Sequence, residues 1–247
     1  YGAHEAALDI DRLRQLTRPG GSEPDGGRRR DARFYRREGD DPHRLRLKIY
    51  QNEGALPLSD TVPALENFGF EVLTEIPTSI AGGDLGTVHD FLLGLAPGAD
   101  AGAIVTRSDA IERAVAGVLN DTAENDPFNR LVVQTGLAAE EAEWLRAIYR
   151  YLRQAGAGFT IYTVVDALAR APSVTTALVE LFRGRHDPDF AGDRDDAADE
   201  ARDAIRTALA KVAAINDDRL LRLYQAVIDA MLRTNAFSPA AAEALAF

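Results

Sequence analysis

The densest group of chemically versatile side chains lies in "AENDPFNRLVVQTGL", residues 123–137. Seven consecutive positions hold two carboxylates, two amides and a guanidinium, on Glu124, Asn125, Asp126, Asn129 and Arg130. Such groups could exchange protons or hold a polar ligand. They also suit a helix start, because Asp and Asn are favoured N-cap residues and a proline, here Pro127, fits the first helical position. The choice between a site and a helix start depends on the elements around the cluster.

Other residues with catalytic or metal-binding potential are scattered. The histidines at positions 4, 43, 89 and 186 do not have helical metal-ligand spacing, and there is no cysteine. His89 and Asp90 are neighbours in an expected strand and would point to opposite faces, which disfavours a catalytic pair. There is no nucleophile elbow, and the glycines of residues 81–86 precede a strand instead of opening a helix. We therefore expect no catalytic, cofactor-binding or metal-binding residues in this sequence.

An acidic run at residues 193–203 is the remaining candidate metal site. It lacks the alternating ligands, the central glycine and the closing glutamate of a calcium loop. The pattern favours a solvated loop that leads into a helix N-terminus over a divalent cation site.

Composition narrows the classes of function. The 247 residues are 46% hydrophobic, which suits one large or two modest globular domains. A formal charge of −11 disfavours nucleic acid and anionic lipid as partners. No run approaches the roughly 18 to 20 apolar residues of a membrane span, and the N-terminal sequence does not have the pattern of a signal peptide. We expect a cytoplasmic protein with protein or small-molecule partners.

The chain divides into three regions by pattern: residues 1–31, 32–122 and 123–247. Residues 1–18 are expected to form a short helix through the apolar side chains Ala6, Leu8, Ile10, Leu13 and Leu16. Residues 18–31 are rich in glycine, proline and charge and are expected to be a flexible loop. Arg28 to Arg30 could form a phosphate patch, although a solvated loop is favoured because no aromatic residue is interleaved.

Residues 32–122 have the pattern of a small α+β layer. A hairpin over 32–50 turns at residues 39–42 and should have one solvated face, because Leu45, Leu47 and Ile49 alternate with polar residues. A helix follows over 59–68, with Ser59 or Asp60 as its cap. Core strands are expected over 70–77 and 86–95, and a final helix begins at Ser108 or Asp109. The order predicts helices on one face of a mostly antiparallel sheet.

Residues 123–247 have no clear strand pattern and are expected to form an all-α helical bundle. The strongest helix covers about 139–155, with acidic residues near its start and arginines near its end. Two more helices meet at Pro172, which fits the first turn of the second. A helix over 204–215 and a last one, capped by Asp217 or Asp218, complete the bundle.

Four blocks of sequence in the same order resemble the large bacterial NAD-dependent glutamate dehydrogenases. The first block is "LKIYQNEGALPLSDTVPALENFGFEVLTEIP"; the others are "VHDF" at 88–91, "AENDPFNRLVVQTGL" with "LRAIYRYLRQAG", and "LRTNAF" at 232–237. The chain departs from the family pattern at Ala138, where a serine is usual, and at Ala236, where an aromatic residue is more usual. These departures would weaken local capping or packing without changing the fold.

The resemblance implies a parent enzyme that oxidatively deaminates L-glutamate to 2-oxoglutarate and ammonia with NAD. This chain would be an internal segment covering the last ACT-like βαββα module, with an extra N-terminal hairpin, and the helical bundle. The catalytic residues and the NAD site would lie beyond Phe247. The segment would then serve interdomain packing, assembly or regulation, within a chain that forms a homo-oligomer.

The same resemblance suggests where an amino-acid effector would bind. ACT-like domains often hold a ligand near the loop between the first strand and the first helix, here residues 51–59, with Asn52, Gly54 and Ser59 as candidate contacts. The alternative is a module that serves only as a scaffold, because a turn needs such residues anyway. Two other hypotheses stay open, a free-standing amino-acid-sensing module and a hydrolase that uses the acidic residues.

If the chain is a non-catalytic segment, as the resemblance implies, the cluster at 123–137 is better interpreted as a helical junction. Asp126 and Pro127 would begin the helix, with Asn125 as the alternative cap. Helix initiation does not require Asn129 and Arg130, so these two side chains are candidates to tie the helix to a neighbouring module.

Overall fold

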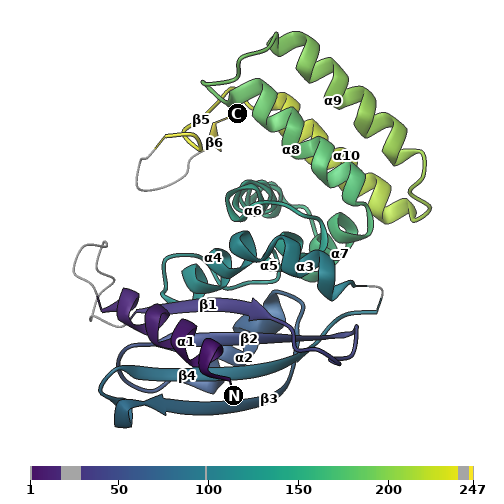
Figure 1. Ribbon diagram of the computed structural model, residues 1–247. Coiled ribbons are helices and arrows are strands. Elements are labelled where there is room, and N and C mark those ends of the chain that lie inside the picture. Colours follow the sequence, from purple (N-terminus) through teal and green to yellow (C-terminus); the bar gives the residue numbers. More distant parts are fainter. Residues whose placement is uncertain (1, 18–28, 98, 239–244, 247) are drawn as a thin grey trace. The chain divides into compact units, whose positions relative to one another are not determined.

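The computed structural model describes residues 2–17, 29–97, 99–238 and 245–246. The chain divides into two compact units, Tyr1–Asn129 and Arg130–Phe247. Figure 1 shows that the first unit contains the sheet and that the second is mainly helical. The expected order of an α+β layer followed by a helical bundle is confirmed.

The first unit combines one antiparallel sheet with helices on both of its faces (Figure 1). Its elements are α1 (Ala3–Leu16), β1 (Arg30–Tyr35), β2 (Arg44–Gln51), α2 (Leu58–Asn67), β3 (Glu71–Ile80), the short 3₁₀ helix η1 (Ala81–Gly83), β4 (Gly86–Gly94), α3 (Ala101–Thr106) and α4 (Ser108–Leu119). The described strands lie in the order β1-β2-β4-β3. This arrangement is the expected βαββα layer with an additional N-terminal strand that forms the hairpin.

The apolar face of β2 forms the centre of the sheet's core. Leu45, Leu47 and Ile49 are all 0% exposed. Their register partners on β1 and β4 are Ala32, Phe34, Phe91 and Leu93, together with His89 opposite Ile49. The Phe34 and Phe70 rings pack with centroids 5.5 Å apart on this core. Full burial of one such aliphatic or aromatic side chain stabilises the fold by about 1.5–3 kcal/mol.

The second face of the hairpin is not solvated, so that prediction was wrong. Helix α1 covers it, and the two residues of β2 beneath the helix, Lys48 and Tyr50, are 1% and 0% exposed. Helices therefore lie on both faces of the sheet instead of one, because α2 and α4 pack on the other side. Alternation of charged and apolar residues indicated two faces but could not show that a helix covers the polar one.

The buried stripe of α1 also differs from the expected apolar one. Leu8 is 36% exposed, whereas Asp9 and Leu13 are fully buried. Leu13 packs with Tyr50 and Val88. Residues 18–28, where a flexible loop was expected, lie outside the described residues.

Strand β3 was expected to be a core strand ending at Pro77, and both points are corrected. It runs through Pro77 to Ile80, pairs only with β4 among the described strands, and is mostly exposed. A proline is tolerated here because an edge strand has no second neighbour that needs its missing N–H.

The opposite edge of the sheet, along β1, is closed by side chains. Asn120 accepts a hydrogen bond from the Arg30 N–H and donates one to its carbonyl, at 2.9 and 2.8 Å. Further along, Arg12 donates to the Ala32 carbonyl and Glu112 accepts from the Phe34 N–H. Arg30 therefore belongs to a paired strand and not to the expected solvated loop. Side-chain partners on the outer backbone groups block pairing with another strand.

Most of the expected helix caps are wrong. Helices α2 and α4 follow Pro57 and Arg107, and neither N-cap has a side-chain hydrogen bond. Ser59, Asp60, Ser108 and Asp109 lie inside the first turns instead. In the second unit Asp217 binds Arg170 through two hydrogen bonds of 2.9 and 3.0 Å, instead of capping the last helix. Asp217 has a local preference for a cap position, but the contact with Arg170, which is distant in sequence, holds its carboxylate instead.

The second unit contains six described helices and a short ladder of two strands. They are α5 (Asn129–Gln134), α6 (Ala139–Gln154), α7 (Ile161–Arg170), α8 (Pro172–His186), α9 (Arg194–Leu209), α10 (Ile215–Ala230), β5 (Arg233–Thr234) and β6 (Leu245–Ala246). Helix α5 begins at the last residue of the first unit. The fully buried Tyr224 of α10 donates to the Leu145 carbonyl of α6 and so joins two of the helices. Pro172 is at the first position of α8, as predicted.

Replacing Asn120 with alanine should destabilise the first unit by about 1–3 kcal/mol, because both backbone groups of Arg30 lose their partner at the sheet edge. Urea denaturation, followed by far-UV circular dichroism, measures this loss. The matched control is Asn67→Ala, which removes a single exposed hydrogen bond to Asn125 and should change stability by less than about 0.5 kcal/mol. Equal losses in the two variants would contradict a structural role for the Asn120 contact.

Candidate functional site

The junction cluster at 123–137 consists of side chains engaged in separate contacts. The Asp126 carboxylate accepts a hydrogen bond of 2.9 Å from the Phe128 N–H, and α5 begins at Asn129, two residues after Pro127. The Asn129 side chain is 6% exposed and donates to the Glu124 carbonyl at 2.9 Å. Arg130 forms an ion pair of 2.9 Å with Asp166 of α7. The side chains do not converge on one point, so the cluster has the geometry of a structural junction.

The candidate effector residues lie along one loop, between β2 and α2. The Asn52 side-chain oxygen accepts from the Arg29 N–H at 2.8 Å, and Gly54 has a φ of 76°, a left-handed conformation that favours glycine. Ser59 is exposed and donates to Asp60 at 3.1 Å. None of the three residues lines the hollows that the structure forms among α6 to α10 of the second unit.

The most concentrated polar network in the first unit was not predicted, and it lies between α1 and β2. The Lys48 ammonium donates to Asp9 at 2.6 Å and to Glu5 at 2.8 Å. The Tyr50 hydroxyl donates to Asp9 at 2.7 Å, and Arg33 of β1 donates to Glu5 at 2.5 Å. Two cations and one hydroxyl on the sheet thus hold two carboxylates on the helix.

The environment of this network shifts the pKa of several members. Burial raises the pKa of Glu5, but hydrogen bonds from Lys48 and Arg33 outweigh it and leave that pKa below its usual value. Burial and the bond to Asp9 raise the pKa of the Tyr50 hydroxyl far above its usual value. At neutral pH the tyrosine is therefore protonated, and the Glu5 carboxylate is ionised.

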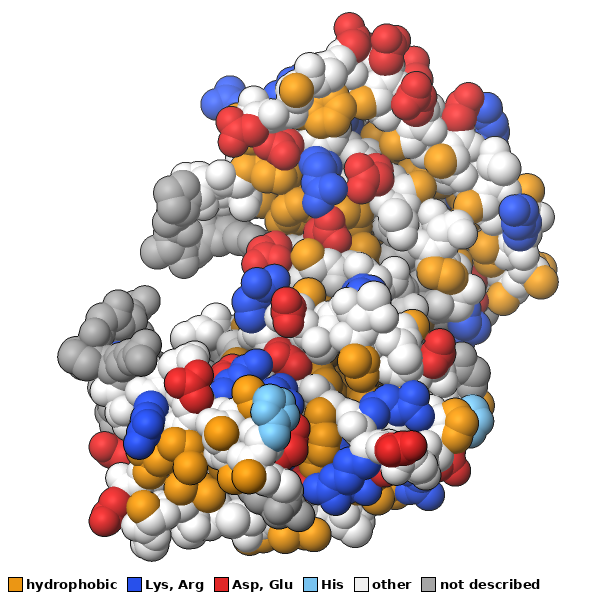
Figure 2. Space-filling view, viewed as in Figure 1, with side chains coloured by type: hydrophobic (Ala, Val, Ile, Leu, Met, Phe, Trp, Pro, Cys, Tyr) orange, Lys and Arg blue, Asp and Glu red, His pale blue; other side chains and the backbone are white. Residues whose placement is uncertain are grey.

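A second pair of charges flanks the network on the same face of the sheet. The Tyr35 hydroxyl donates to both oxygens of Asp90, at 2.7 and 2.6 Å, and Arg37 pairs with Asp90 at 3.2 Å. Figure 2 shows acidic and basic side chains interleaved on the face of this unit that α1 covers. His89, the neighbour of Asp90, instead binds Glu75 at 2.7 Å on the opposite face.

The sequence itself contains a pattern that indicates this network. Glu5, Asp9 and Leu13 recur at intervals of four, which places them on one side of a helix. Lys48 and Tyr50 share the polar face of their strand. Connecting the two patterns required knowing that the helix packs on that face.

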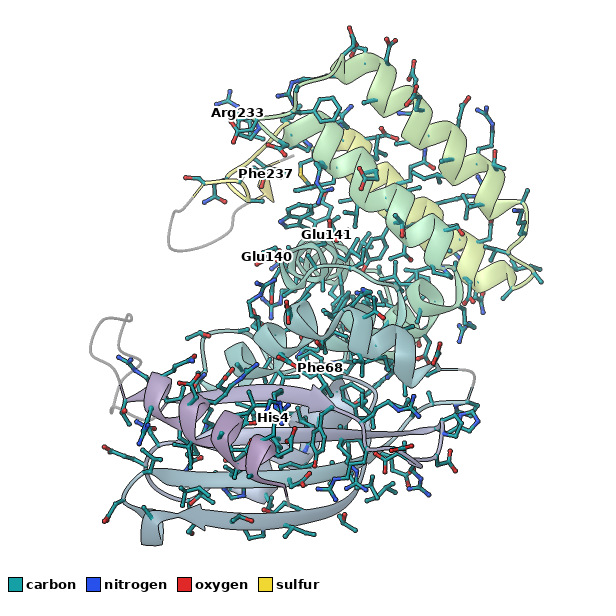
Figure 3. The ribbon with its side chains drawn as sticks, viewed as in Figure 1. His4, Phe68, Glu140, Glu141, Arg233 and Phe237 are labelled. Carbon is teal, nitrogen blue, oxygen red and sulfur yellow. The ribbon has the colours of Figure 1, made fainter. Side chains whose placement is uncertain are left out.

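In the second unit an aromatic cluster anchors the segment after α10. The Trp144 ring lies 4.8 Å from Phe182 and 5.0 Å from Phe237, centroid to centroid. His186 packs 5.2 Å from Phe182, and burial together with Arg185 and Arg194 lowers its pKa. Figure 3 shows Phe237 in the C-terminal segment and Glu141 at the start of α6. These contacts hold residues 232–238 against α6 and α8.

The two departures from the expected family pattern have local consequences here. Ala138, before α6, offers no side-chain acceptor, although its N–H donates to Glu141 at 2.8 Å. Ala236 uses its N–H to bind the Thr234 hydroxyl at 3.0 Å. Backbone donors thus keep partners at both positions.

The described residues also include a hollow and an acidic run, both in the second unit. A hollow of about 360 Å³ lies where α7 meets α8 and α9 approaches α10, lined in part by Arg170, Ser173, Lys211 and Asp217. Among those residues no group of three or more His, Asp or Glu side chains is placed to hold a metal ion. The acidic run leads into α9, where Asp193 accepts hydrogen bonds from the Asp195 and Asp196 N–H groups as an N-cap. No described helix is both long and apolar enough to cross a membrane.

Comparison with known proteins gives two matches in the order of the two units. Residues 29–104 match the family model for the glutamate dehydrogenase ACT3 domain, and residues 123–188 match that for glutamate dehydrogenase helical motif 3. The NAD-specific glutamate dehydrogenase of Pseudomonas aeruginosa is 33% identical over 244 residues, which is 97% of this chain. That of Halomonas elongata is 32% identical over 237 residues, or 95% of this chain.

The matched relatives are much longer than this chain. It spans 14% of the length of each of these two proteins. The NAD-specific glutamate dehydrogenase of Mycobacterium tuberculosis is 31% identical over 189 residues, which cover 73% of this chain and 12% of that protein.

At the junction, alanine at Asn129 should destabilise the chain more than alanine at Arg130. Removing the amide of the buried Asn129 deletes its hydrogen bond to the carbonyl of the exposed Glu124 and leaves a gap in the packing, a loss of about 1–2 kcal/mol. The Arg130–Asp166 pair is partly exposed, with side chains 25% and 43% exposed, so its loss should cost about 0.2–1 kcal/mol. Chemical denaturation measures both variants, and size-exclusion chromatography checks their assembly. The reverse order of stability would contradict the structural roles described here.

Proposed function

We propose that this chain, which belongs to the NAD-specific glutamate dehydrogenase family, is a non-catalytic structural and regulatory segment of a larger enzyme. The observation that carries the proposal is the order of the two matches, an ACT3 domain followed by helical motif 3, in a chain that spans 14% of its relatives. The engagement of the junction side chains in packing contacts supports the same function.

In this proposal the larger enzyme oxidatively deaminates L-glutamate to 2-oxoglutarate and ammonia, and NAD accepts the hydride. The names of the three relatives support this reaction. NAD would bind in a catalytic region outside residues 1–247. The enzyme would be a cytoplasmic homo-oligomer, and the partners of this segment would be other modules of the same enzyme.

The junction residues have a structural role in this proposal. Asp126 and Asn129 fix the turn that leads into α5, and Arg130 links α5 to α7. The three residues would then matter for assembly and not for a chemical step.

An amino-acid effector is a second candidate function, and the loop at 51–59 favours it. Gly54 allows a ligand to approach the backbone closely, and the Ser59 hydroxyl is exposed at the first turn of α2. Asn52 holds the start of the loop against Arg29. The free-standing amino-acid-sensing module would use the same residues without a catalytic region.

The proposed lack of catalysis can be tested by comparing two proteins. A full-length enzyme containing this sequence should reduce NAD in the presence of L-glutamate, measured by NADH absorbance. Residues 1–247 alone should not, because the groups that bind NAD and transfer the hydride would be absent. Glutamate-dependent reduction by the isolated chain would refute the proposal.

The effector hypothesis predicts heat in isothermal titration calorimetry of the chain with L-amino acids. Glutamate, aspartate and the branched-chain amino acids are the probes. Ser59→Ala should reduce any heat, whereas Ser238→Ala, which changes an exposed serine of the second unit, should not. A flat trace with all probes would leave the loop as a scaffold.

A further inference from the structure

We propose that the sheet face beneath the N-terminal half of α1 is a binding site for small dicarboxylates, and that Glu5 and Asp9 of α1 occupy it in this structure. The site uses none of the residues of the loop at 51–59. If the site beneath α1 binds no dicarboxylate, the effector hypothesis for the loop at 51–59 is unaffected, and the reverse also holds.

The sheet side of the site is a preorganised set of donors. Lys48 is 1% exposed, and its ammonium contacts both helix carboxylates, at 2.6 and 2.8 Å. Arg33 contacts Glu5 at 2.5 Å and lies 3.8 Å from Asp9. Arg33 also donates to the Tyr50 hydroxyl at 3.1 Å, which orients that hydroxyl toward Asp9. Arg33 and Tyr50 are thus joined to each other, and the Lys48 ammonium lies 5.1 Å from the centre of the Tyr35 ring, so the sheet places the donors side by side.

Two carboxylates of α1 balance two cations on this face. Arg37 pairs with Asp90 and Arg46 pairs with Asp40, whereas Lys48 and Arg33 contact Glu5 and Asp9. With the N-terminal half of the helix lifted, Lys48 and Arg33 would face solvent as two neighbouring positive charges, and a small dianion would replace the lost carboxylates through charge-assisted hydrogen bonds.

The chemistry of the present occupant defines the ligand class. Glu5 and Asp9 are one helical turn apart, so the sheet recognises two carboxylates joined by a short spacer. Glutarate carries two carboxylates separated by three methylene groups and has a comparable span. A neutral diamide of the same shape lacks the charge that Lys48 and Arg33 require.

The two halves of α1 are held differently, which allows its N-terminal half to move. Leu13 and Leu16, near the C-terminal end, pack in an apolar group with Tyr50, Val88, Ile80 and Leu85. Figure 2 shows hydrophobic side chains gathered beside this end of the helix. Arg12 adds an ion pair of 2.7 Å with Asp31. The N-terminal half contributes the carboxylates of Glu5 and Asp9 and no member of this apolar group, and in this proposal it lifts while the C-terminal half stays in place.

A free dicarboxylate has to compete with α1, and this competition determines the ligand concentration that is needed. Because α1 belongs to the same chain, its carboxylates compete with a free ligand at an effective concentration of at least about millimolar. A free dicarboxylate must therefore reach millimolar levels or more to replace α1. Neutralising Glu5 and Asp9 should lower the concentration needed by at least about tenfold.

The two lysines of the sequence allow a direct test by amine labelling and mass spectrometry. Lys48 is buried and Lys211, on the second unit, is exposed and serves as the internal reference. In the E5Q/D9N variant, Lys48 should be labelled faster relative to Lys211. Glutarate should then protect Lys48 and not Lys211, while glutaramide should protect neither.

The matched control is Asp11→Asn, which removes the same charge from α1 at an exposed position where the carboxylate binds only Gln15. It should leave Lys48 labelling unchanged. Circular dichroism verifies that each variant is folded. If E5Q/D9N is unfolded, hydrogen exchange of the unaltered chain decides, because glutarate, and not glutaramide, should increase exchange at residues 3–10. Unchanged Lys48 labelling in E5Q/D9N, no protection by glutarate, or no exchange response would each overturn the proposal.

Discussion

Lys48 and Asp9 form an oppositely charged pair that is almost completely removed from water, and the first unit depends on their contact. Burial of a single charge is costly unless it is paired and hydrogen-bonded, and breaking a buried pair typically costs about 3–5 kcal/mol. Tyr50, Glu5 and Arg33 supply the additional hydrogen bonds that make this burial tolerable. When helix α1 covers the sheet, this pairing selects the orientation that places its carboxylates over Lys48.

This constraint extends to the rest of the sheet. With α1 on one face and α2 and α4 on the other, β2 is buried on both sides and fixes the register of its neighbours. Arg12 reaches from α1 to the edge of β1, where Glu112 and Asn120 complete the partners of the backbone. One edge is thereby closed, whereas β3 remains an exposed edge. Arg12 thus connects the helix that covers the polar face to the closed edge at β1.

The helical unit is organised by different interactions. Aromatic packing around Trp144 and Phe182 holds the segment after α10, and the buried Tyr224 joins α10 to α6. The stretch from Glu124 to Arg130 contains the division between the units, and its side chains serve turns and helix contacts. A cluster with the composition of an active site thus has the geometry of a junction, in agreement with a non-catalytic segment of a larger enzyme.

Periodicity in the sequence determined the elements and their order, because apolar residues at intervals of two or of three and four fix which side chains share a face. It also determined the α+β layer and the helical bundle. Four blocks of residues in a fixed order separately indicated the family by resemblance. Only the tertiary structure decided that α1 covers the polar face of β2, that β3 is an edge strand, and that Asp217 binds Arg170 instead of capping a helix. In the first and third cases a charged side chain with a strong local preference for water or for a cap is buried or redirected, because a partner distant in sequence supplies the opposite charge. The edge position of β3 depends on the order in which the strands pair, which local periodicity does not encode.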